Sequence, residues 1–260
     1  MTALVDTHSH IDVEEFAPDR EAVIARAVAA GVAQQVVPAI EAATWPRLRD
    51  VCAGIEGLHA AYGLHPVFLA RHRDAHLDLL REWIERERPV AVGECGLDHF
   101  VDGLDRGRQG ELFAAQLRIA RDFDLPVIVH ARHAVDAVIA ALRRVGGLRG
   151  VVHSFSGSRQ QAETLWKLGF LVGLGGPVTY ERARRLRMLA ATMPVEFLLL
   201  ETDAPDQPGA THRGERNEPM HLRHVLDAVA ALRGEAPDAL ARATTANAER
   251  LFRLRPAASA

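Results

Sequence analysis

The stretch Ala3-Leu4-Val5-Asp6-Thr7-His8-Ser9-His10 decides the fold, because a short apolar run passes directly into metal-binding residue types, and this arrangement recurs along the chain. Successive side chains of a β-strand point to opposite faces, so His8 and His10 lie on the same face. Two imidazoles on one face can share a metal ion, whereas a single histidine at a strand end is often only a polar residue. The stretch alone leaves both interpretations open.

Short apolar runs alternate with helical segments over the whole chain. Eight such runs, each followed by apolar residues at helical spacing, are typical of parallel strands joined by helical crossovers. No Gly-x-Gly-x-x-Gly turn follows the first run, so we expect an α/β fold that is a distorted (β/α)₈ TIM barrel rather than a doubly wound sheet. We expect one domain over residues 1–254 and a flexible tail at 255–260. After the first run, the expected strands are 32–39, 58–62, 89–92, 126–130, 150–153, 170–174 and 196–200. The expected helices are 18–30, 43–53, 74–86, 108–124, 134–145, 159–168, 179–192, 219–233 and 238–252.

Composition narrows the class of protein. The chain of 260 residues is 48% hydrophobic and 25% charged, as in ordinary globular proteins, and its net charge of −3 argues against a broad basic face for nucleic acid. Cys52 and Cys95 are too few and too far apart for a disulfide scaffold or a cysteine-based zinc site. No signal peptide or membrane-spanning run is evident, so we expect a cytoplasmic protein that binds no membrane and needs no obligate protein partner.

The polar residues that close the apolar runs point to a metal site. In (β/α)₈ barrels the chemistry lies at the C-terminal ends of the strands. Five of the 13 histidines and two carboxylates fall at these ends, which is a larger share than isolated structural histidines would give. These residues are His8, His10, His65, Glu94, His130, His153 and Asp203.

This donor set favours two cations and hydrolysis. Imidazole and carboxylate without thiolate suit zinc, manganese, iron or magnesium. A carboxylate that bridges two cations lets both act on one water, which becomes a bridging hydroxide near neutral pH. We therefore expect two divalent ions (Zn, Mn or Mg) and a hydrolytic reaction.

Seven spaced motifs resemble those of the TatD-type metal-dependent deoxyribonucleases, a family of the amidohydrolase superfamily. The resemblance extends in order from residue 6 to residue 219, which is nearly the whole expected domain. The motifs are Asp6-Thr-His-Ser-His10, Gly63-Leu-His-Pro66, Gly93-Glu-Cys-Gly-Leu-Asp98, Pro126-Val-Ile-Val-His130-Ala-Arg132, His153-Ser-Phe-Ser-Gly157, Glu201-Thr-Asp-Ala-Pro205 and Arg216-Asn-Glu-Pro219.

The resemblance implies a role for each of these residues. His8, His10 and Asp203 would hold one metal ion. His130 and His153 would hold the second, with Glu94 bridging the two. Asp203 would also take the proton of the bridging water, which makes Glu94 and Asp203 the catalytic carboxylates. The implied reaction is phosphodiester hydrolysis from DNA ends, as a 3′→5′ exonuclease on single-stranded DNA or DNA ends.

The residues expected to face the substrate phosphate are His65, Arg132, Ser156 and Arg216. An arginine offers a planar two-pronged donor to phosphate, although a structural ion pair is the alternative for both arginines. His133, Ser154 and the His99-Phe100 pair depart from the usual family pattern, which affects the expected substrate preference and not the metal ligands.

Other substrates remain open at this stage. An amidohydrolase acting on a small amide, lactone or ester would use the same hydroxide, as would hydrolysis of an aminoacyl-tRNA ester. A carboxylated lysine cannot bridge the metals, since the sole lysine, Lys167, falls in the expected helix 159–168. A non-catalytic binding protein would be expected to have lost ligands, and all six are present.

Overall fold

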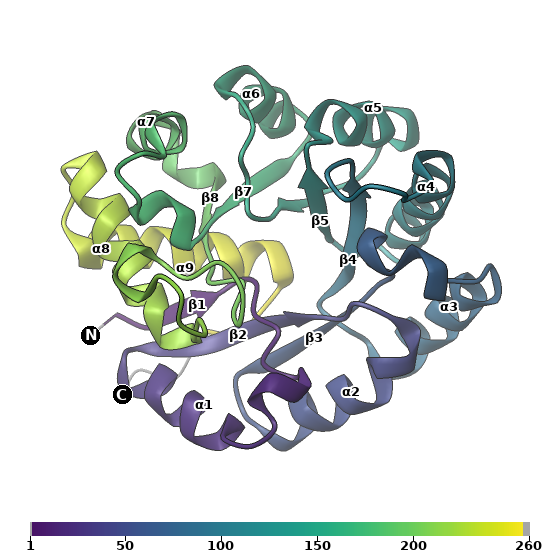
Figure 1. The fold of residues 1–260 in the computed structure, drawn as a ribbon, viewed down its shortest axis with the longest axis horizontal. Helices are drawn as coiled ribbons and strands as arrows, with labels where there is room; N and C mark the ends of the chain where they lie inside the picture. The colour runs from purple at the N-terminus through teal and green to yellow at the C-terminus, as the bar shows by residue number, and fades with distance from the viewer. Residues whose placement is uncertain (1, 257–260) are drawn as a thin grey trace.

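The computed structural model describes residues 2–256, in which eight parallel strands form one nearly closed barrel inside a ring of helices (Figure 1). The strands pair in chain order from β1 to β8, which confirms the predicted (β/α)₈ fold. The strands are β1 (Leu4–Asp6), β2 (Val32–Pro38), β3 (Leu58–Tyr62), β4 (Ala91–Asp98), β5 (Val127–Arg132), β6 (Gly150–Val152), β7 (Phe170–Leu174) and β8 (Leu198–Leu200). The α-helices are α1 (Arg20–Ala29), α2 (Trp45–Gly54), α3 (Ala75–Glu87), α4 (Arg106–Asp122), α5 (Val135–Val145), α6 (Arg159–Lys167), α7 (Arg184–Thr192), α8 (Leu222–Arg233) and α9 (Pro237–Phe252).

The barrel interior is a separate apolar cluster to which every strand contributes one side chain. Val5, Val36 and Ala61 belong to it, as do their counterparts on the other five strands. The remaining members come from the C-terminal part of the chain, including Leu251 and Phe252 of α9. Because α9 packs against β1 and β8, it closes one end of the barrel, and the polar strand ends gather at the other.

Hydrogen bonds between the segments that follow β1 and β8 bring the first and last strands together. Thr7 N donates to Leu200 O over 3.1 Å, Asp203 N donates to His8 O over 2.8 Å, and His10 N donates to Ala204 O over 2.8 Å. Residues almost 200 positions apart in sequence therefore share one fixed register at the mouth of the barrel.

Three elements differ from the sequence-based expectation. β4 continues to Asp98 instead of ending at Val92, because Gly96 and Asp98 still pair with β5. The expected helix 179–192 begins only at Arg184, as α7, and a 3₁₀ turn, Gly176–Thr179, precedes it. β8 is shorter than expected, since Val195–Phe197 forms a 3₁₀ turn before it.

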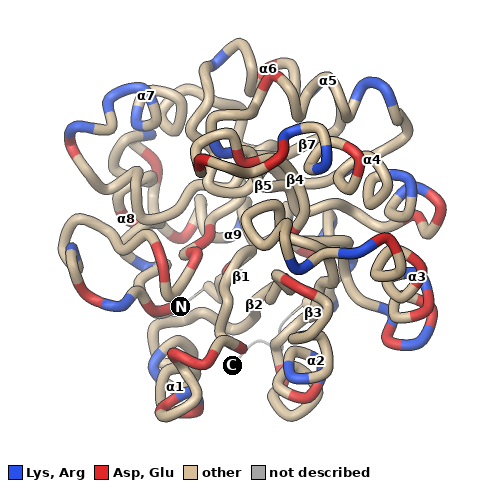
Figure 2. Tube along the Cα trace, turned by 45° about the vertical axis from the view of Figure 1, so that its right-hand side comes forward, with Lys and Arg blue, Asp and Glu red and all other residues tan. Residues whose placement is uncertain are grey.

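Charged residues are interspersed over the outer helices and loops, with both signs on the same elements (Figure 2). Within residues 2–256, no helix is both long enough and apolar enough to cross a membrane. The expected tail 255–260 lies mostly outside the described residues; Arg255, which is described, accepts a hydrogen bond at its carbonyl from Gln34 Nε2 over 3.2 Å.

Candidate metal centre

Asp6 fixes the backbone of the two segments that follow β1 and β8, which carry His8, His10 and Asp203. Its Oδ1 accepts hydrogen bonds from His8 N (3.2 Å) and Thr202 N (3.0 Å), and its Oδ2 accepts from the Thr202 hydroxyl. Burial raises the pKa of Asp6 to about 7. Asp6 is therefore a buried support for the site and does not reach its centre.

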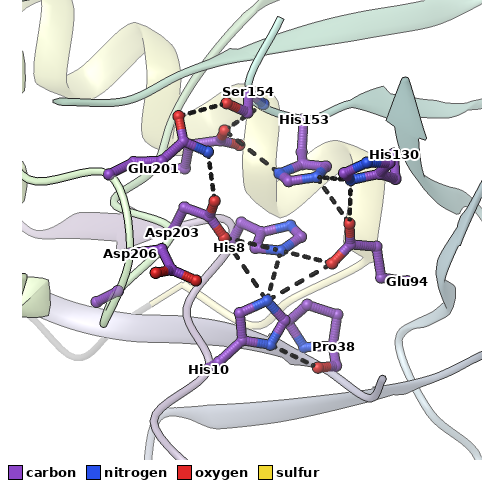
Figure 3. A network of polar contacts seen from close by, with 12 residues as sticks. His8, His10, Pro38, Glu94, His130, His153, Ser154, Glu201, Asp203 and Asp206 are labelled. Atoms are coloured by element: carbon purple, nitrogen blue, oxygen red, sulfur yellow. Dashed lines mark hydrogen bonds and ion pairs between the residues drawn. The ribbon is translucent and has the colours of Figure 1, made fainter. Parts of the chain in front are cut away.

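Four donor atoms converge in the first cluster: Nε2 of both His8 and His10, Oε2 of Glu94 and Oδ1 of Asp203 (Figure 3). His8 Nε2 lies 3.2 Å from His10 Nε2, 3.1 Å from Glu94 Oε2 and 3.5 Å from Asp203 Oδ1. His10 Nε2 lies 3.5 Å from Glu94 and 3.6 Å from Asp203. Ligand atoms about 2.0–2.2 Å from one ion lie ~3.0–3.6 Å apart in octahedral or tetrahedral arrangement, so this spacing fits a bound cation.

A second cluster surrounds the other oxygen of the same carboxylate. Glu94 Oε1 lies 2.8 Å from His153 Nε2, 3.0 Å from His130 Nδ1 and 3.0 Å from His65 Nε2. His130 Nδ1 is in turn 3.4 Å from His153 Nε2 and 3.3 Å from His65 Nε2. Figure 3 shows Glu94 between the two clusters, with one oxygen directed to each.

In His10 and His130, a hydrogen bond to the ring nitrogen that points away from Glu94 leaves the nitrogen that faces Glu94 free to bind a metal. His10 Nδ1 lies 3.1 Å from the Pro38 carbonyl, which can only accept, so Nδ1 carries the proton and Nε2 keeps its lone pair. His130 Nε2 lies 2.9 Å from Asp98 Oδ2, which leaves His130 Nδ1 free to face Glu94. Such a carboxylate or carbonyl behind a histidine fixes the ring of a metal ligand.

His65 has the opposite arrangement. Val67 N donates to His65 Nδ1 over 3.2 Å, so the single proton of the neutral ring lies on Nε2. Burial lowers the pKa of His65 to about 4, which keeps the ring neutral. His65 thus stands beside the second cluster as a hydrogen-bond donor, in keeping with its expected role toward a substrate phosphate.

The pKa shifts of Glu94, His10 and His153 show that the site favours positive charge on both sides of Glu94. Burial alone would raise the pKa of Glu94, but the nearby His65, His153 and His8 hold it well below its usual range. Burial opposes charge on His10 and His153 as well, yet Glu94 raises their pKa values to about 9 and about 10. Glu94 thus favours positive charge on both of its sides, which bound cations would supply while the ligating imidazoles stay neutral. The residues present therefore fit a cation in each cluster.

Several residues that hold the site in place were missed by the sequence analysis. Asp98, which was quoted only within a motif, supports His130, and two glutamines of α4 hold neighbouring backbone. Gln109 bonds both the N–H and the carbonyl of Asp98, and Gln116 does the same for Leu64, the residue before His65. The two glutamines are seven residues apart and share one helix face, which is the sequence signal that could have identified them.

Gln207 and Glu201 are two further polar residues beside the ligands. Gln207 Nε2 donates to Asp203 Oδ2, which leaves Oδ1 directed at His8 and His10. Glu201 is buried behind His153, 3.7 Å from its Nδ1, and burial raises the pKa of Glu201 to about 8.

Two of the expected substrate-binding side chains besides His65 line the cavity above the clusters, which has a volume of about 730 Å³. Arg132 and Ser156 reach this cavity, and Arg132 lies over the ring of Phe100 at 3.7 Å. Arg216 does not line it. Both terminal nitrogens of Arg216 bond Asp19, at 2.9 and 2.7 Å, so its guanidinium is held in the structural ion pair that was the alternative interpretation.

The chain matches a known protein family over almost its whole length. The family described as TatD related DNase matches residues 5–253. The chain belongs to the TatD family.

Relatives of this TatD-family chain are similar over nearly their full length. An uncharacterized metal-dependent hydrolase, YjjV, from Escherichia coli K12 is 43% identical over 251 residues, covering 95% of this chain and 97% of YjjV. The crystal structure of the same TatD homologue superimposes with a TM-score of 0.92 and 41% identity, covering 97% of this chain and 98% of that one. A protein of Erwinia billingiae named 3′-5′ ssDNA/RNA exonuclease TatD is 35% identical, covering 96% of this chain and 99% of its relative. The chain is thus a TatD-family metal-dependent hydrolase with His and Glu clusters able to bind metal.

Proposed function

We propose that this hydrolase is a deoxyribonuclease that cleaves phosphodiester bonds at the ends of single-stranded DNA in the 3′→5′ direction. The observation that carries the proposal is the division of five donor residues into two clusters by the carboxylate of a sixth, Glu94. In this assignment His8, His10 and Asp203 hold one divalent ion, and His130 and His153 hold the other. The exonuclease name of the Erwinia billingiae relative supports the choice of substrate.

Divalent cations bound at these two positions would lower the pKa of water and draw charge from a phosphate oxygen. The chain itself orients the reactants and moves the proton. The carboxylate of Asp203, whose Oδ2 accepts a hydrogen bond from Gln207 Nε2, takes the proton of the attacking water. His65 donates from Nε2 to a phosphate oxygen, and Arg132 and Ser156 offer further donors from the cavity wall.

The experiment is an activity screen on end-labelled single-stranded DNA after chelation and re-addition of zinc, manganese or magnesium. We expect stepwise shortening from the 3′ end with a restoring metal. Asp203→Asn should bind metal and lose most activity. Cleavage by Asp203→Asn at the wild-type rate would contradict its role as proton acceptor.

A panel of small lactones, amides and esters and an aminoacyl-tRNA, assayed beside the DNA, tests the choice of substrate. Turnover of one of these substrates, with DNA left intact under every metal, would overturn the nuclease assignment.

A further inference from the structure

An exposed aromatic side chain lies at the mouth of the cavity, and a cation is stacked on it. Phe100 is 50% exposed, and the guanidinium of Arg132 lies 3.7 Å from the centre of its ring. The ring of His133 meets Phe100 edge-on at 5.1 Å. Within residues 2–256, no carboxylate lies within ion-pair distance of Arg132, so its charge is available to a ligand.

A groove begins beside this aromatic residue and continues down the outside of the barrel. The groove lies between α4 and α5, has a volume of about 750 Å³ and includes His99, the neighbour of Phe100. Gly107 and Gly110 of α4 line it, and the space beside Gly110 is open, because a side chain there would meet no atom within 4 Å. Its apolar floor includes Phe113, Ala114 and Ala141.

Four arginines border the groove: Arg106, Arg118, Arg121 and Arg144. In the described part of the chain, Arg106, Arg118 and Arg144 have no carboxylate within ion-pair distance. The one acidic residue of the groove, Glu111, is paired with Arg108 at 3.2 Å. The groove is therefore positively charged in a protein whose net charge is −3.

The length of the groove matches an extended, regularly charged ligand. Arg106 and Arg121 are 15 residues apart on one helix, which at 1.5 Å per residue corresponds to about 22 Å. A small ester bound in the cavity would not reach these arginines.

We propose that Phe100, Arg132 and the α4/α5 groove bind the part of a single-stranded nucleic acid that extends beyond the cleaved end. A base stacks on Phe100 or on the plane of Arg132, and backbone phosphates follow the arginines of the groove. This inference rests on the proposed nuclease function for the cleaved bond. Its binding component can be measured without hydrolysis.

The test is fluorescence anisotropy of a labelled phosphorothioate oligothymidylate of about 15 nucleotides with the metal-loaded protein. We expect Arg118→Ala/Arg144→Ala to raise Kd about tenfold and to reduce the slope of log K against log salt by about 1.4, at ~0.7 per phosphate contact. Phe100→Ala should raise Kd about tenfold through lost stacking. The matched control Arg185→Ala/Arg242→Ala removes two exposed, unpaired charges of the described chain from other helices, and we expect it to leave Kd near the wild-type value.

A dinucleotide, which is too short to reach Arg118 or Arg144, should bind the double variant as it binds the wild type. Equal losses for the two double variants, no loss for Arg118→Ala/Arg144→Ala, or a change of oligomeric state in that variant by ultracentrifugation would each overturn the assignment. The same binding measurement with oligouridylate tests whether the groove contacts only the phosphate backbone and therefore binds RNA as well as DNA. If the wild-type protein bound the oligonucleotide through the groove but cleaved no DNA, the nuclease function would be refuted and the binding role of the groove would be retained.

Discussion

Replacing Asp98 by asparagine should impair the second metal cluster without touching a ligand. Asp98 Oδ1 accepts the N–H groups of Phe100 and Val101, both at 2.9 Å, and Oδ2 lies 2.9 Å from His130 Nε2. In Asp98→Asn the amide oxygen is retained by the two backbone N–H groups. The amide NH₂ then faces His130 Nε2.

This exchange reverses the tautomer of His130. A donor opposite Nε2 moves the ring proton to Nδ1, which is the atom that faces Glu94 Oε1 at 3.0 Å. Loss of such a supporting carboxylate reduces metal affinity by about 10–100-fold, or about 1.4–2.8 kcal/mol. The first cluster does not contact Asp98, so we expect one of two binding events to weaken.

Isothermal titration of the chelated protein with zinc or manganese measures both affinities, and long-range ¹⁵N spectra of the histidines report the tautomer of His130. Asp102→Asn is the matched control, since it removes the same charge from an exposed position in the loop that follows Asp98. If the amide instead turned to keep its oxygen toward His130, two backbone N–H groups would lose their acceptor, and Tm would fall markedly. An Asp98→Asn variant with wild-type Tm, wild-type affinity at both sites and an unchanged tautomer would refute the reasoning.

Three further predictions concern other parts of the molecule. Arg216→Ala should lower Tm, because Asp19 and Glu218 lose one of the two arginines that pair with them and keep only Arg26, and should change KM less than about threefold; a large rise in KM would restore its expected contact with substrate. Burial and the neighbouring His212 and His224 lower the pKa of His221 to about 4. Between about pH 6.5 and 4 the unfolded chain therefore binds a proton that the folded chain does not, so stability present above pH 6.5 is lost as the pH falls through this range. His221→Gln should abolish about 1–2 kcal/mol of this loss in urea titrations, and an unchanged pH profile would contradict the assignment. Chelation should lower Tm by roughly 5–10 °C relative to metal at ~100 times its Kd, and an unchanged Tm would show that no ion stabilises the fold.

The fold was predictable because its signal is repetitive. Each strand is an apolar run long enough to identify, and polar residues at its C-terminal end reveal where the barrel opens. β4 was predicted too short because its second half, from Gly93 to Asp98, contains glycines and carboxylates that resemble a loop. These residues stay in the strand because β5 supplies their hydrogen bonds, which is information that a single sequence does not carry.

The candidate site was predictable in its ligand types and less so in its supporting contacts. The positions of His8, His10 and His153, which follow the ends of β1 and β6, agree with the rule that barrel chemistry lies at strand ends. The pairing of Arg216 with Asp19 depends on α1 lying beside the segment after β8, a contact between parts of the chain almost 200 residues apart. Residue type favoured a phosphate contact for Arg216 and left this ion pair as the alternative.

The five histidines of the site show how a supporting contact decides a role that residue type leaves open. His10, His130 and His65 each place a nitrogen near Glu94, within 3.0–3.5 Å. The Pro38 carbonyl and the Asp98 carboxylate each accept a hydrogen bond from the far side of a ring, which leaves a lone pair facing the clusters. Val67 N instead donates a hydrogen bond to His65, which leaves an N–H facing them. A donor suits an anionic substrate and an acceptor suits a cation, so these hydrogen bonds separate the substrate contact proposed for His65 from the metal contact proposed for His130, although the two nitrogens lie only 3.3 Å apart.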